Sequence, residues 1–245
     1  MKPEFHILIP ARLDSTRLPQ KALADINGKA LVVHTLETAL VSGAASVHVA
    51  TDSPAIADAV TGAGGQVVMT SSDHRSGTDR LAEAAGQLGF PDQAIVVNLQ
   101  GDEPAMPTAC LVQVARLLEA DAEARMATLW QAIVDRQQWL DPNVVKLVAD
   151  ARGRALYFSR AAIPHVRDGG WPQGDGRRHV GLYAYRAGAL KAWQSLASSA
   201  LEIHESLEQL RALEAGWIIA CARAAETIPV GIDTPADLER LRQSL

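Results

Sequence analysis

An α/β fold with a mostly parallel sheet and helices on both faces is predicted by two observations on the sequence. Short apolar runs of strand length alternate with stretches of helical periodicity through roughly the first 125 residues. The run 94–99 is apolar almost throughout, as expected for a strand buried on both faces of a sheet. Beyond that alternating region longer strands follow one another, so we expect an appended mixed α/β portion.

The composition is that of a folded, globular chain. Of its 245 residues, 48% are hydrophobic and 21% are charged, and the formal net charge is −5. This balance argues against a nucleic-acid partner. Residues 1–6 lead into a strand without a long apolar segment, so we expect neither a signal peptide nor a membrane span, and a cytoplasmic location. Cys110 and Cys221 stand far apart and are expected to be buried rather than disulfide-bonded or metal-binding.

Local signals place the elements of the first half. Helix 29–42 has apolar residues at helical spacing and ends at Gly43, which suits a left-handed conformation. Ser53 and Pro54 suit the cap and first turn of a second helix, which Gly64 ends. The remaining elements are a turn at 25–28, strands at 7–9, 46–50, 66–69 and 94–99, and a helix at 107–120.

The second half is expected to begin with strands at 126–134, 144–150, 156–158 and 180–185. The segment 165–178 contains four glycines and alternating charges, which is typical of a mobile surface loop. Residues 201–215 have the spacing of one helix. Thr234 suits the cap of a last helix, 234–244, which leaves Asp233 free to point elsewhere.

A cationic loop follows the first strand. Pro10 ends that strand because it has no amide hydrogen for a sheet, and Arg12, Arg17 and Lys21 come next. Ligands of open α/β sheets bind outside the carboxyl ends of the strands, where three cations suit a polyanion such as a nucleoside triphosphate. A solvated basic loop explains this stretch equally well when it is taken alone.

Two further polar stretches have both a functional and a simpler explanation. Ser76 and Gly77 could offer a hydroxyl and amide hydrogens to a ligand, whereas a helix cap by Thr78 is the simpler explanation. In helix 201–215, polar side chains gather within one turn, and a solvated face is the simpler explanation there. These side chains are Glu205, Glu208 and Gln209.

Two carboxylates stand at the ends of elements, Asp102 after a central strand and Asp233 before the last helix. Mg²⁺ prefers carboxylate and phosphate oxygens, and one or two protein carboxylates suffice beside a triphosphate. The pair therefore suits a magnesium–nucleotide site, if the two side chains meet. Capping alone also places aspartates at such positions.

Taken together, these motifs closely resemble the 3-deoxy-manno-octulosonate cytidylyltransferases, also called CMP-Kdo synthetases, from one end of the chain to the other. The phrases that carry the resemblance are Ile9-Pro10-Ala11-Arg12, Ser15-Thr16-Arg17-Leu18-Pro19, Asp25-Ile26-Asn27-Gly28-Lys29, Ala50-Thr51-Asp52, Ser76-Gly77-Thr78, Asn98-Leu99-Gln100-Gly101-Asp102-Glu103-Pro104, Ala155-Leu156-Tyr157-Phe158-Ser159-Arg160, Leu207-Glu208-Gln209-Leu210-Arg211 and Asp233-Thr234-Pro235. The family transfers CMP from CTP to the anomeric hydroxyl of the acidic sugar Kdo, and pyrophosphate is released. The resemblance implies this activity here, for lipopolysaccharide biosynthesis, with Mg²⁺ as cofactor.

The resemblance also implies an organisation. We expect a single domain, 1–245, with a Rossmann-like nucleotide-binding part at about 1–125 and a sugar-binding and dimerisation part at about 126–230. Helix 234–244 would return to the first part. The expected partners are the substrates CTP and Kdo and a second copy of the chain, with no membrane partner.

Site residues are carried over position by position. The nucleotide contacts implied are Pro10, Ala11, Arg12, Lys21, Ser76, Gly77 and Gln100. Arg12 and Lys21 would face the phosphates and take part in catalysis together with the magnesium ligands Asp102 and Asp233. The sugar contacts implied are Gln100, Arg160, His179, Tyr183, Glu205 and Gln209. The guanidinium fork of Arg160 suits a carboxylate.

Some positions depart from the family pattern and leave alternatives open. Gln20 stands where members usually have glycine, Ser71 where some have arginine, and His165 where tryptophan is frequent. His204 is given no role, because the order of residues around it differs from that in some relatives. A cytidylyltransferase for 8-amino-Kdo or sialic acid, a non-catalytic nucleotide- or sugar-binding module, and a periplasmic sugar-binding protein are the alternatives.

Overall fold

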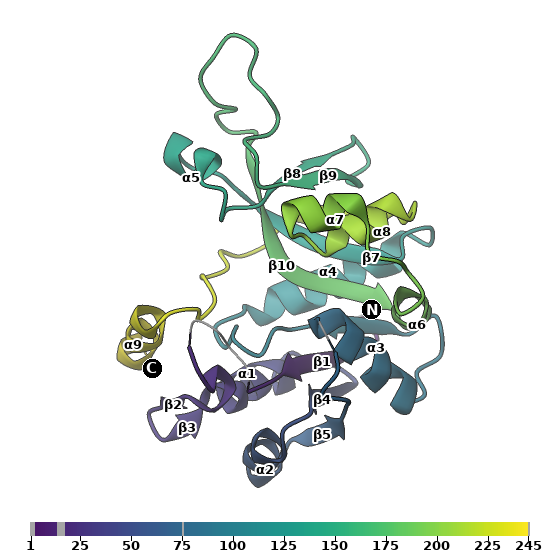
Figure 1. The fold of residues 1–245 in the computed structure, drawn as a ribbon, viewed down its shortest axis with the longest axis vertical. Coiled ribbons are helices and arrows are strands. Elements are labelled where there is room, and N and C mark those ends of the chain that lie inside the picture. The colour runs from purple at the N-terminus through teal and green to yellow at the C-terminus, as the bar shows by residue number, and fades with distance from the viewer. Residues whose placement is uncertain (1–2, 14–17, 75, 245) are drawn as a thin grey trace.

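The computed structural model describes residues 3–13, 18–74 and 76–244, and its centre is a twisted sheet in the order β11-β7-β10-β6-β1-β4-β5 (Figure 1). The strands are β1 (His6–Ala11), β2 (Asp25–Ile26), β3 (Lys29–Ala30), β4 (Ser46–Thr51), β5 (Gln66–Met69), β6 (Ile95–Asn98), β7 (Met126–Ala132), β8 (Lys146–Ala149), β9 (Ala155–Ser159), β10 (Arg177–Arg186) and β11 (Ile219–Arg223). The helices are α1 (Leu31–Leu40), α2 (Pro54–Gly62), α3 (Gly77–Gln87), α4 (Thr108–Ala120), α5 (Arg136–Leu140), α6 (Ala187–Trp193), α7 (Ala200–Glu205), α8 (Gln209–Glu214) and α9 (Pro235–Ser244), with the 3-10 turn η1 (Lys21–Leu23).

The order of the strands creates a binding crevice at β1. This strand pairs in parallel with β4 on one side and with β6 on the other, while β5 continues the sheet beyond β4. The chain therefore builds outward from β1 in one direction and then returns to its other side. In open α/β sheets, such a switch point opens a crevice outside the carboxyl ends of the strands.

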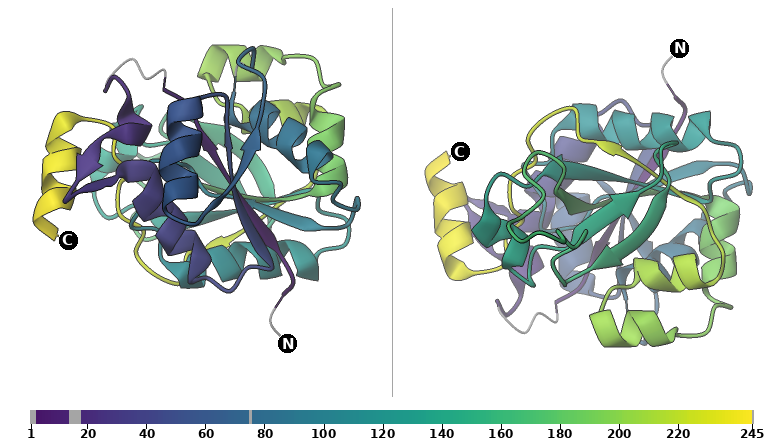
Figure 2. Two further views of the ribbon diagram at one scale, coloured as in Figure 1. Left: turned by 90° about the horizontal axis from the view of Figure 1, so that it is seen from below. Right: turned by 90° about the horizontal axis from the view of Figure 1, so that it is seen from above.

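Alternation along β1 explains the layers on the two faces of the sheet. Ile7 and Ile9 belong to a core that also contains buried residues of α1, α2 and α4, whereas Leu8 belongs to a second core with α3 and α6. Successive strand residues point to opposite faces, so a strand that is apolar throughout is covered on both. Figure 2 shows these helices on the two sides of the sheet. The predicted α/β class is confirmed.

Several predicted ends of helices are confirmed by the local geometry. The Ser53 side chain accepts a hydrogen bond from the backbone N–H of Ile56 at the start of α2. Gly43 and Gly64 have φ values of 77° and 78° and follow α1 and α2. Thr234 and Asp237 form the expected reciprocal cap of α9, in which each side chain accepts from the backbone N–H of the other residue.

Two helix predictions are wrong. Helix 29–42 begins only at Leu31, because Lys29–Ala30 pairs with Asp25–Ile26 in a hairpin. The helix predicted at 201–215 is two helices, α7 and α8, separated at Ser206, whose φ of 50° is left-handed. A left-handed residue cannot continue an α-helix.

The prediction that Pro10 ends the first strand is wrong. β1 continues to Ala11, and Pro10 pairs with Ala50 of β4 where β1 is no longer paired with β6.

Other differences concern the second half of the chain. Sequence patterns did not reveal α5, α6 or β11, although β11 pairs in parallel with β7 at the edge of the sheet. The glycine-rich segment 165–178 projects from the sheet and consists of bends and turns, but its last two residues already belong to β10 (Figure 1). Among the described residues, no helix has the length and apolar content needed to cross a lipid bilayer.

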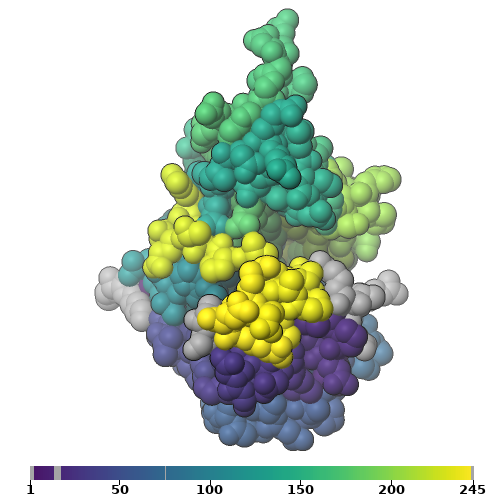
Figure 3. All heavy atoms as spheres, turned by 90° about the vertical axis from the view of Figure 1, so that its left-hand side faces the viewer, coloured from purple at the N-terminus to yellow at the C-terminus, as the bar shows by residue number. Residues whose placement is uncertain are grey.

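The last helix, α9, lies against the hairpin near the start of the chain (Figure 3). Leu238 and Leu241 pack with Ile26 and Leu31 in a small apolar cluster of their own. The guanidinium of Arg242 donates to the backbone oxygen of Asp25 at 2.7 Å. These contacts fix the segment that precedes α9 near the carboxyl end of β1.

An irregularity in β10 is supported by one buried hydroxyl. The register between β10 and β7 shifts between Val180 and Tyr183. The Thr128 hydroxyl of β7 is fully buried and lies 3.0 Å from the oxygen of Val180 and 2.9 Å from that of Leu182. It therefore provides a donor where the ladder of backbone hydrogen bonds is interrupted.

We expect Thr128→Val to lower the free energy of unfolding by about 1–3 kcal/mol, because burial of carbonyls without a donor carries that cost. Urea denaturation of both proteins measures the difference. Thr128→Ser, which keeps the hydroxyl, is the matched control and should retain most of the stability. Equal losses in the two variants would mean that the methyl group, not the hydroxyl, supports this part of β10.

Candidate nucleotide and metal site

A pocket of about 330 Å³ lies at the carboxyl ends of β1 and β6. It is lined by Pro10, Ala11, Arg12, Lys21, Ala22, Leu31, His74, Ser76, Gly77, Arg80, Gln100, Gly101, Asp102 and Asp233. The structure thus brings together every residue predicted to bind the nucleotide and both predicted metal ligands. The third predicted cation of the first loop, Arg17, lies outside the described residues.

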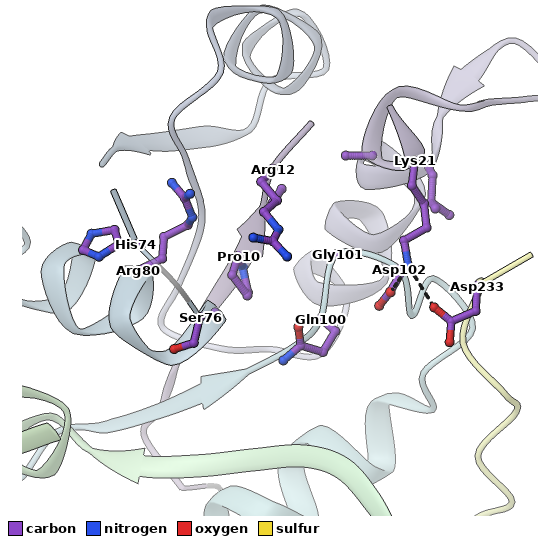
Figure 4. A pocket seen from close by; sticks show the side chains of 14 residues that line it. Pro10, Arg12, Lys21, His74, Ser76, Arg80, Gln100, Gly101, Asp102 and Asp233 are labelled. Atoms are coloured by element: carbon purple, nitrogen blue, oxygen red, sulfur yellow. Dashed lines mark hydrogen bonds and ion pairs between the residues drawn. The ribbon is translucent and has the colours of Figure 1, made fainter. Parts of the chain in front are cut away.

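The two ends of the pocket differ in chemistry (Figure 4). Lys21, Asp102 and Asp233 lie together at one end, and His74 and Arg80 lie at the other. Pro10, near the end of β1, and Arg12, which follows β1, lie between these groups. The pocket therefore offers an elongated ligand a strongly charged end and an end closed by ring and guanidinium groups.

At the charged end, the Lys21 ammonium joins two carboxylates. Its Nζ lies 2.5 Å from Oδ2 of Asp102 and 3.1 Å from Oδ1 of Asp233. The lysine side chain is only 17% exposed. Burial by itself would lower the pKa of Lys21, but the charges and hydrogen bonds of Asp102 and Asp233 outweigh it and raise that pKa. The ammonium is therefore charged throughout the physiological range.

The backbone around Asp102 explains why this carboxylate lies so near β1. A Cβ added to Gly101 would lie 3.0 Å from the backbone oxygen of Pro10, so a larger residue there would press against the end of β1. The Thr35 hydroxyl donates to the Gly101 oxygen at 3.0 Å, and the Ile232 N–H donates to the Asp102 oxygen at 2.9 Å. The last of these bonds also brings the segment before α9 to the pocket.

Asp233 reaches the site because the cap of α9 uses a different carboxylate. Asp237 accepts the backbone N–H of Asp233 at 3.1 Å and that of Thr234 at 2.8 Å. The side chain of Asp233 is not required by this cap, and its Oδ1 accepts from Lys21. The sequence indicated that the cap of the last helix does not need Asp233, and in the structure the Asp233 side chain contacts Lys21.

A third acid, Glu103, follows Asp102 in the sequence. Burial, with the nearby charges of Asp102 and Asp233, raises the pKa of Glu103 to about 8, although Arg178 acts in the opposite direction. Glu103 is therefore largely protonated at neutral pH and adds little negative charge to this end of the pocket.

Helix α3 begins at the other end of the pocket. Ser76 caps it, because the Ser76 hydroxyl accepts from the backbone N–H of Asp79 at 3.1 Å. The prediction that Thr78 is the cap is wrong; its hydroxyl instead donates to Glu208 at 3.0 Å. Ser76 and Gly77, at the N-terminus of α3, line the pocket with Pro10, and backbone N–H groups there favour an anion or a polar group.

Arg80 and His74 line the pocket although the sequence did not single them out. Arg80 is buried and pairs with Asp52 at 3.2 Å, and its Nη1 donates to the hydroxyl of Thr70 at 2.5 Å. His74 bonds to Glu83. One signal in the sequence could have identified Arg80. It follows Ser76 by four residues, so in a helix that begins at Ser76 it lies on the same face.

Five of the six predicted sugar-binding residues lie outside the nucleotide pocket, directly after β9 and on β10, α7 and α8, whereas Gln100 lines the pocket. Glu205 accepts from the Arg160 backbone N–H at 2.9 Å and from the Ser159 hydroxyl at 2.6 Å. The Arg160 guanidinium donates to backbone oxygens of Pro142 and of residues 205 and 206. Gln209 is buried. Arg160 therefore ties the loop before β8 to the end of α7.

His179 and Tyr183 form the part of this group nearest the sheet. The His179 ring lies 5.3 Å from the Tyr183 ring and 5.0 Å from the Phe158 ring, centroid to centroid. Burial, with the nearby charge of Arg178, lowers the pKa of His179 to about 3. The imidazole is therefore neutral at physiological pH, and its Nε2 lies 3.1 Å from the Thr128 hydroxyl.

Strand β10 connects the two groups of residues. It runs antiparallel to β6 and places Tyr183 opposite Asn98. The side-chain oxygen of Asn98 accepts from the Gln100 amide at 3.2 Å, and Gln100 lines the nucleotide pocket. Gln100, which was predicted to contact both substrates, thus lies on the sheet between the two groups.

The charged end of the pocket fits a divalent cation bound together with a triphosphate. No group of three or more His, Cys, Asp or Glu residues suited to a metal occurs in the described part of the chain. Asp102 and Asp233 nevertheless converge on one cation, the Lys21 ammonium. Mg²⁺ is commonly held by one or two carboxylates, with phosphate oxygens and water completing its shell. The donor set suits that arrangement.

The open α/β sheet and the charged pocket at its switch point define a nucleotide-binding enzyme of the nucleotidyltransferase class. The sequence matches the cytidylyltransferase family over residues 6–228. It is 48% identical to a 3-deoxy-manno-octulosonate cytidylyltransferase from Thioalkalivibrio sulfidiphilus and 51% identical to one from Serratia proteamaculans, with 98% of each chain covered in both cases.

A solved structure of CMP:2-keto-3-deoxy-manno-octonic acid synthetase, complexed with CTP, superposes with a TM-score of 0.91 at 42% identity and covers 98% of both chains. The chain belongs to the 3-deoxy-manno-octulosonate cytidylyltransferase family.

The neutral state of His179 predicts a pH dependence of stability. Above its ordinary pKa of 6.5 the ring is neutral in both states, whereas between that value and about 3 only the unfolded chain takes up the proton. We expect the free energy of unfolding to fall by about 1–2 kcal/mol more in the wild type than in His179→Gln between about pH 7 and pH 5.

Urea denaturation at both pH values measures this difference. His204→Gln, at an exposed histidine of α7, is the control and should behave as the wild type does. If His179→Gln and the wild type lose stability in parallel, the imidazole is not kept neutral by the fold.

Proposed function

We propose that this protein transfers CMP from CTP to the anomeric hydroxyl of 3-deoxy-manno-octulosonate, Kdo, and releases pyrophosphate. The observation that carries the proposal is the charged end of the pocket, where Lys21, Asp102 and Asp233 meet outside the ends of β1 and β6. The relatives that share this fold at about half identity carry the name of that activity.

The pocket suggests how the nucleotide lies. Arg12 and Lys21 supply positive charge for the phosphates, and the charge that develops on the leaving pyrophosphate would be stabilised by the same groups. Ser76 and Gly77, at the start of α3, would contact the opposite end of the nucleotide. In this orientation we expect the α-phosphate to lie toward Gln100, whose amide donates to Asn98 opposite Tyr183.

The second group suits an acidic sugar. Arg160 has a planar guanidinium that can bind a carboxylate in two parallel hydrogen bonds. Tyr183, His179, Glu205 and Gln209 offer the hydroxyl, imidazole, carboxyl and amide groups that sugar hydroxyls require. Neutral His179 can accept or donate a hydrogen bond without adding positive charge to this group. Positioning of the acceptor hydroxyl beside the α-phosphate is the contribution expected from these side chains.

Magnesium is proposed as the cofactor, held by Asp102 and Asp233. When bound, Mg²⁺ supplies Lewis acidity and charge neutralisation at phosphate oxygens. The protein's part is to hold two carboxylates of distant segments within reach of one cation, a geometry that the Lys21 contacts support.

The wider setting is part of the same proposal. We infer a cytoplasmic homodimer that supplies CMP-Kdo for lipopolysaccharide biosynthesis. Exposed apolar side chains in the second half of the chain support a dimer interface there; Val134, Leu140 and Leu156 are 76%, 46% and 62% exposed. Sedimentation velocity tests this: a species with the mass of one chain at micromolar concentration would exclude a stable dimer.

The central test is release of pyrophosphate from CTP in the presence of Mg²⁺ and each candidate sugar. We expect Kdo to support the fastest release, and Asp102→Asn to reduce turnover by roughly a hundredfold or more, because a group that organises charge at the reacting phosphate is lost. Asp58→Asn, at an exposed aspartate of α2, is the matched control and should leave turnover unchanged.

Three outcomes would redirect the proposal. Faster release with sialic acid or 8-amino-Kdo would change the sugar and keep the chemistry. CTP binding without any pyrophosphate release would identify a nucleotide-binding module instead. Normal turnover of folded Asp102→Asn at saturating Mg²⁺ would remove that residue from the metal site.

The role given to Arg160 predicts a specific kinetic change. Arg160→Lys keeps the positive charge but loses the planar fork, so we expect the KM for Kdo to rise about tenfold or more while the KM for CTP changes little. Steady-state kinetics with each substrate varied in turn measures the two constants. Equal increases in both constants would indicate that Arg160 supports the fold rather than the sugar.

A further inference from the structure

The Lys21 ammonium lies between the carboxylates of Asp102 and Asp233. Its Nζ lies within hydrogen-bond distance of one oxygen of Asp102 and one of Asp233, at 2.5 Å and 3.1 Å. Figure 4 shows the side chain extending from η1 to the gap between the two carboxylates, while Arg12 points into the pocket without joining them. Lys21 and the carboxylates thus form a three-membered charge cluster.

The cluster joins three segments that are remote in sequence. Lys21 begins η1 after the first loop, Asp102 follows β6, and Asp233 precedes α9. Two carboxylates held this close repel each other unless a positive charge separates them. The segment before α9 is also tied to residue 102 by the Ile232 N–H, so it stays near Asp102 whether or not a cation is present.

We propose that Lys21 is an exchangeable internal counter-ion: it neutralises Asp102 and Asp233 in the metal-free protein and leaves them when a divalent cation and the nucleotide arrive. This inference rests on the function proposed above, which places both the cation and the phosphates at this end of the pocket. It adds that the same ammonium serves two anionic partners in turn, first the carboxylates and then the phosphates.

The arrangement has a consequence for the order of binding. Without nucleotide, a divalent cation must displace a charge-assisted hydrogen-bond donor from both carboxylates, which weakens its binding. A triphosphate offers Lys21 alternative acceptors within the same pocket, so nucleotide and metal favour each other's binding. This mutual effect follows from linkage between two ligands that both require the same movement of Lys21.

The test is metal binding by Lys21→Met in the absence of nucleotide, with Mn²⁺ as the probe. Methionine keeps the apolar stem and removes the ammonium, so the competing cation is lost. Titration followed by electron paramagnetic resonance measures free Mn²⁺ directly. We expect Lys21→Met to bind Mn²⁺ about tenfold or more tightly than the wild type, the factor that corresponds to one lost charge-assisted hydrogen bond.

Two control variants make the comparison specific. Lys191→Met removes a lysine that pairs with exposed Asp92 on the surface, and it should bind Mn²⁺ as the wild type does. Lys21→Met combined with Asp102→Asn should lose the gain in affinity, because one carboxylate is then neutral. Equal Mn²⁺ affinity in Lys21→Met and the wild type would overturn the proposal.

A second measurement needs no substitution and applies even if Lys21→Met does not fold. Reductive methylation of the wild-type protein, read by peptide mass spectrometry, reports how accessible each lysine is. We expect Mn²⁺ to increase the labelling of Lys21 several-fold and to leave Lys29, paired with exposed Glu37, unchanged. Unchanged labelling of Lys21 at saturating Mn²⁺ would show that it keeps its place between the carboxylates.

The outcomes separate this inference from the proposed function. If the wild type releases pyrophosphate from CTP and Kdo but Lys21→Met gains no affinity for Mn²⁺, the function stands and the counter-ion role fails. If Lys21→Met gains affinity but the wild type releases no pyrophosphate with any of the sugars, the counter-ion role stands and the function fails.

Discussion

The charge cluster of Lys21, Asp102 and Asp233 is the interaction on which the rest of the site depends. It brings the first loop, the end of β6 and the segment before α9 to one point. Attraction between opposite charges in a partly buried setting offsets the repulsion of two neighbouring carboxylates. The apolar cluster beneath α9, with Leu238 and Leu241, supports the same geometry without charge. Segments near both ends of the chain therefore form the charged end of the pocket.

The sheet positions this cluster and the second group of side chains relative to each other. β1 and β6 are parallel neighbours, so the loops after both strands leave the sheet at the same edge. β10 runs beside β6 in the opposite direction, pairs Tyr183 with Asn98 at the end of β6, and carries His179 beyond that pair. One antiparallel strand thus adds a second set of polar groups to an otherwise parallel nucleotide-binding sheet, and Thr128 supports the irregularity that this strand contains.

Much of the fold was predictable because its signals are local. Apolar runs, glycines in left-handed positions and caps such as Ser53 and Thr234 depend on a few neighbouring residues. The failures were non-local or conformational. Periodicity alone does not reveal that Ser206 adopts a left-handed conformation between two short helices. Likewise, the helical spacing of the apolar residues does not fix where the helix 29–42 begins, and residues 29 and 30 pair instead with residues 25 and 26 in a hairpin.

For the site, the sequence by itself determined which charged groups could bind a ligand: the cations after β1, the carboxylate after β6, and Asp233, which the cap of the last helix does not require. Motifs carried over from the family named the residues that the pocket then brought together. Only the tertiary structure decided that Asp102 and Asp233 share one cation, that Arg80 lines the pocket, and that Thr78 bonds to Glu208. Contacts of this kind join residues far apart in the chain, so they depend on strand order and helix packing, which no short stretch of sequence encodes.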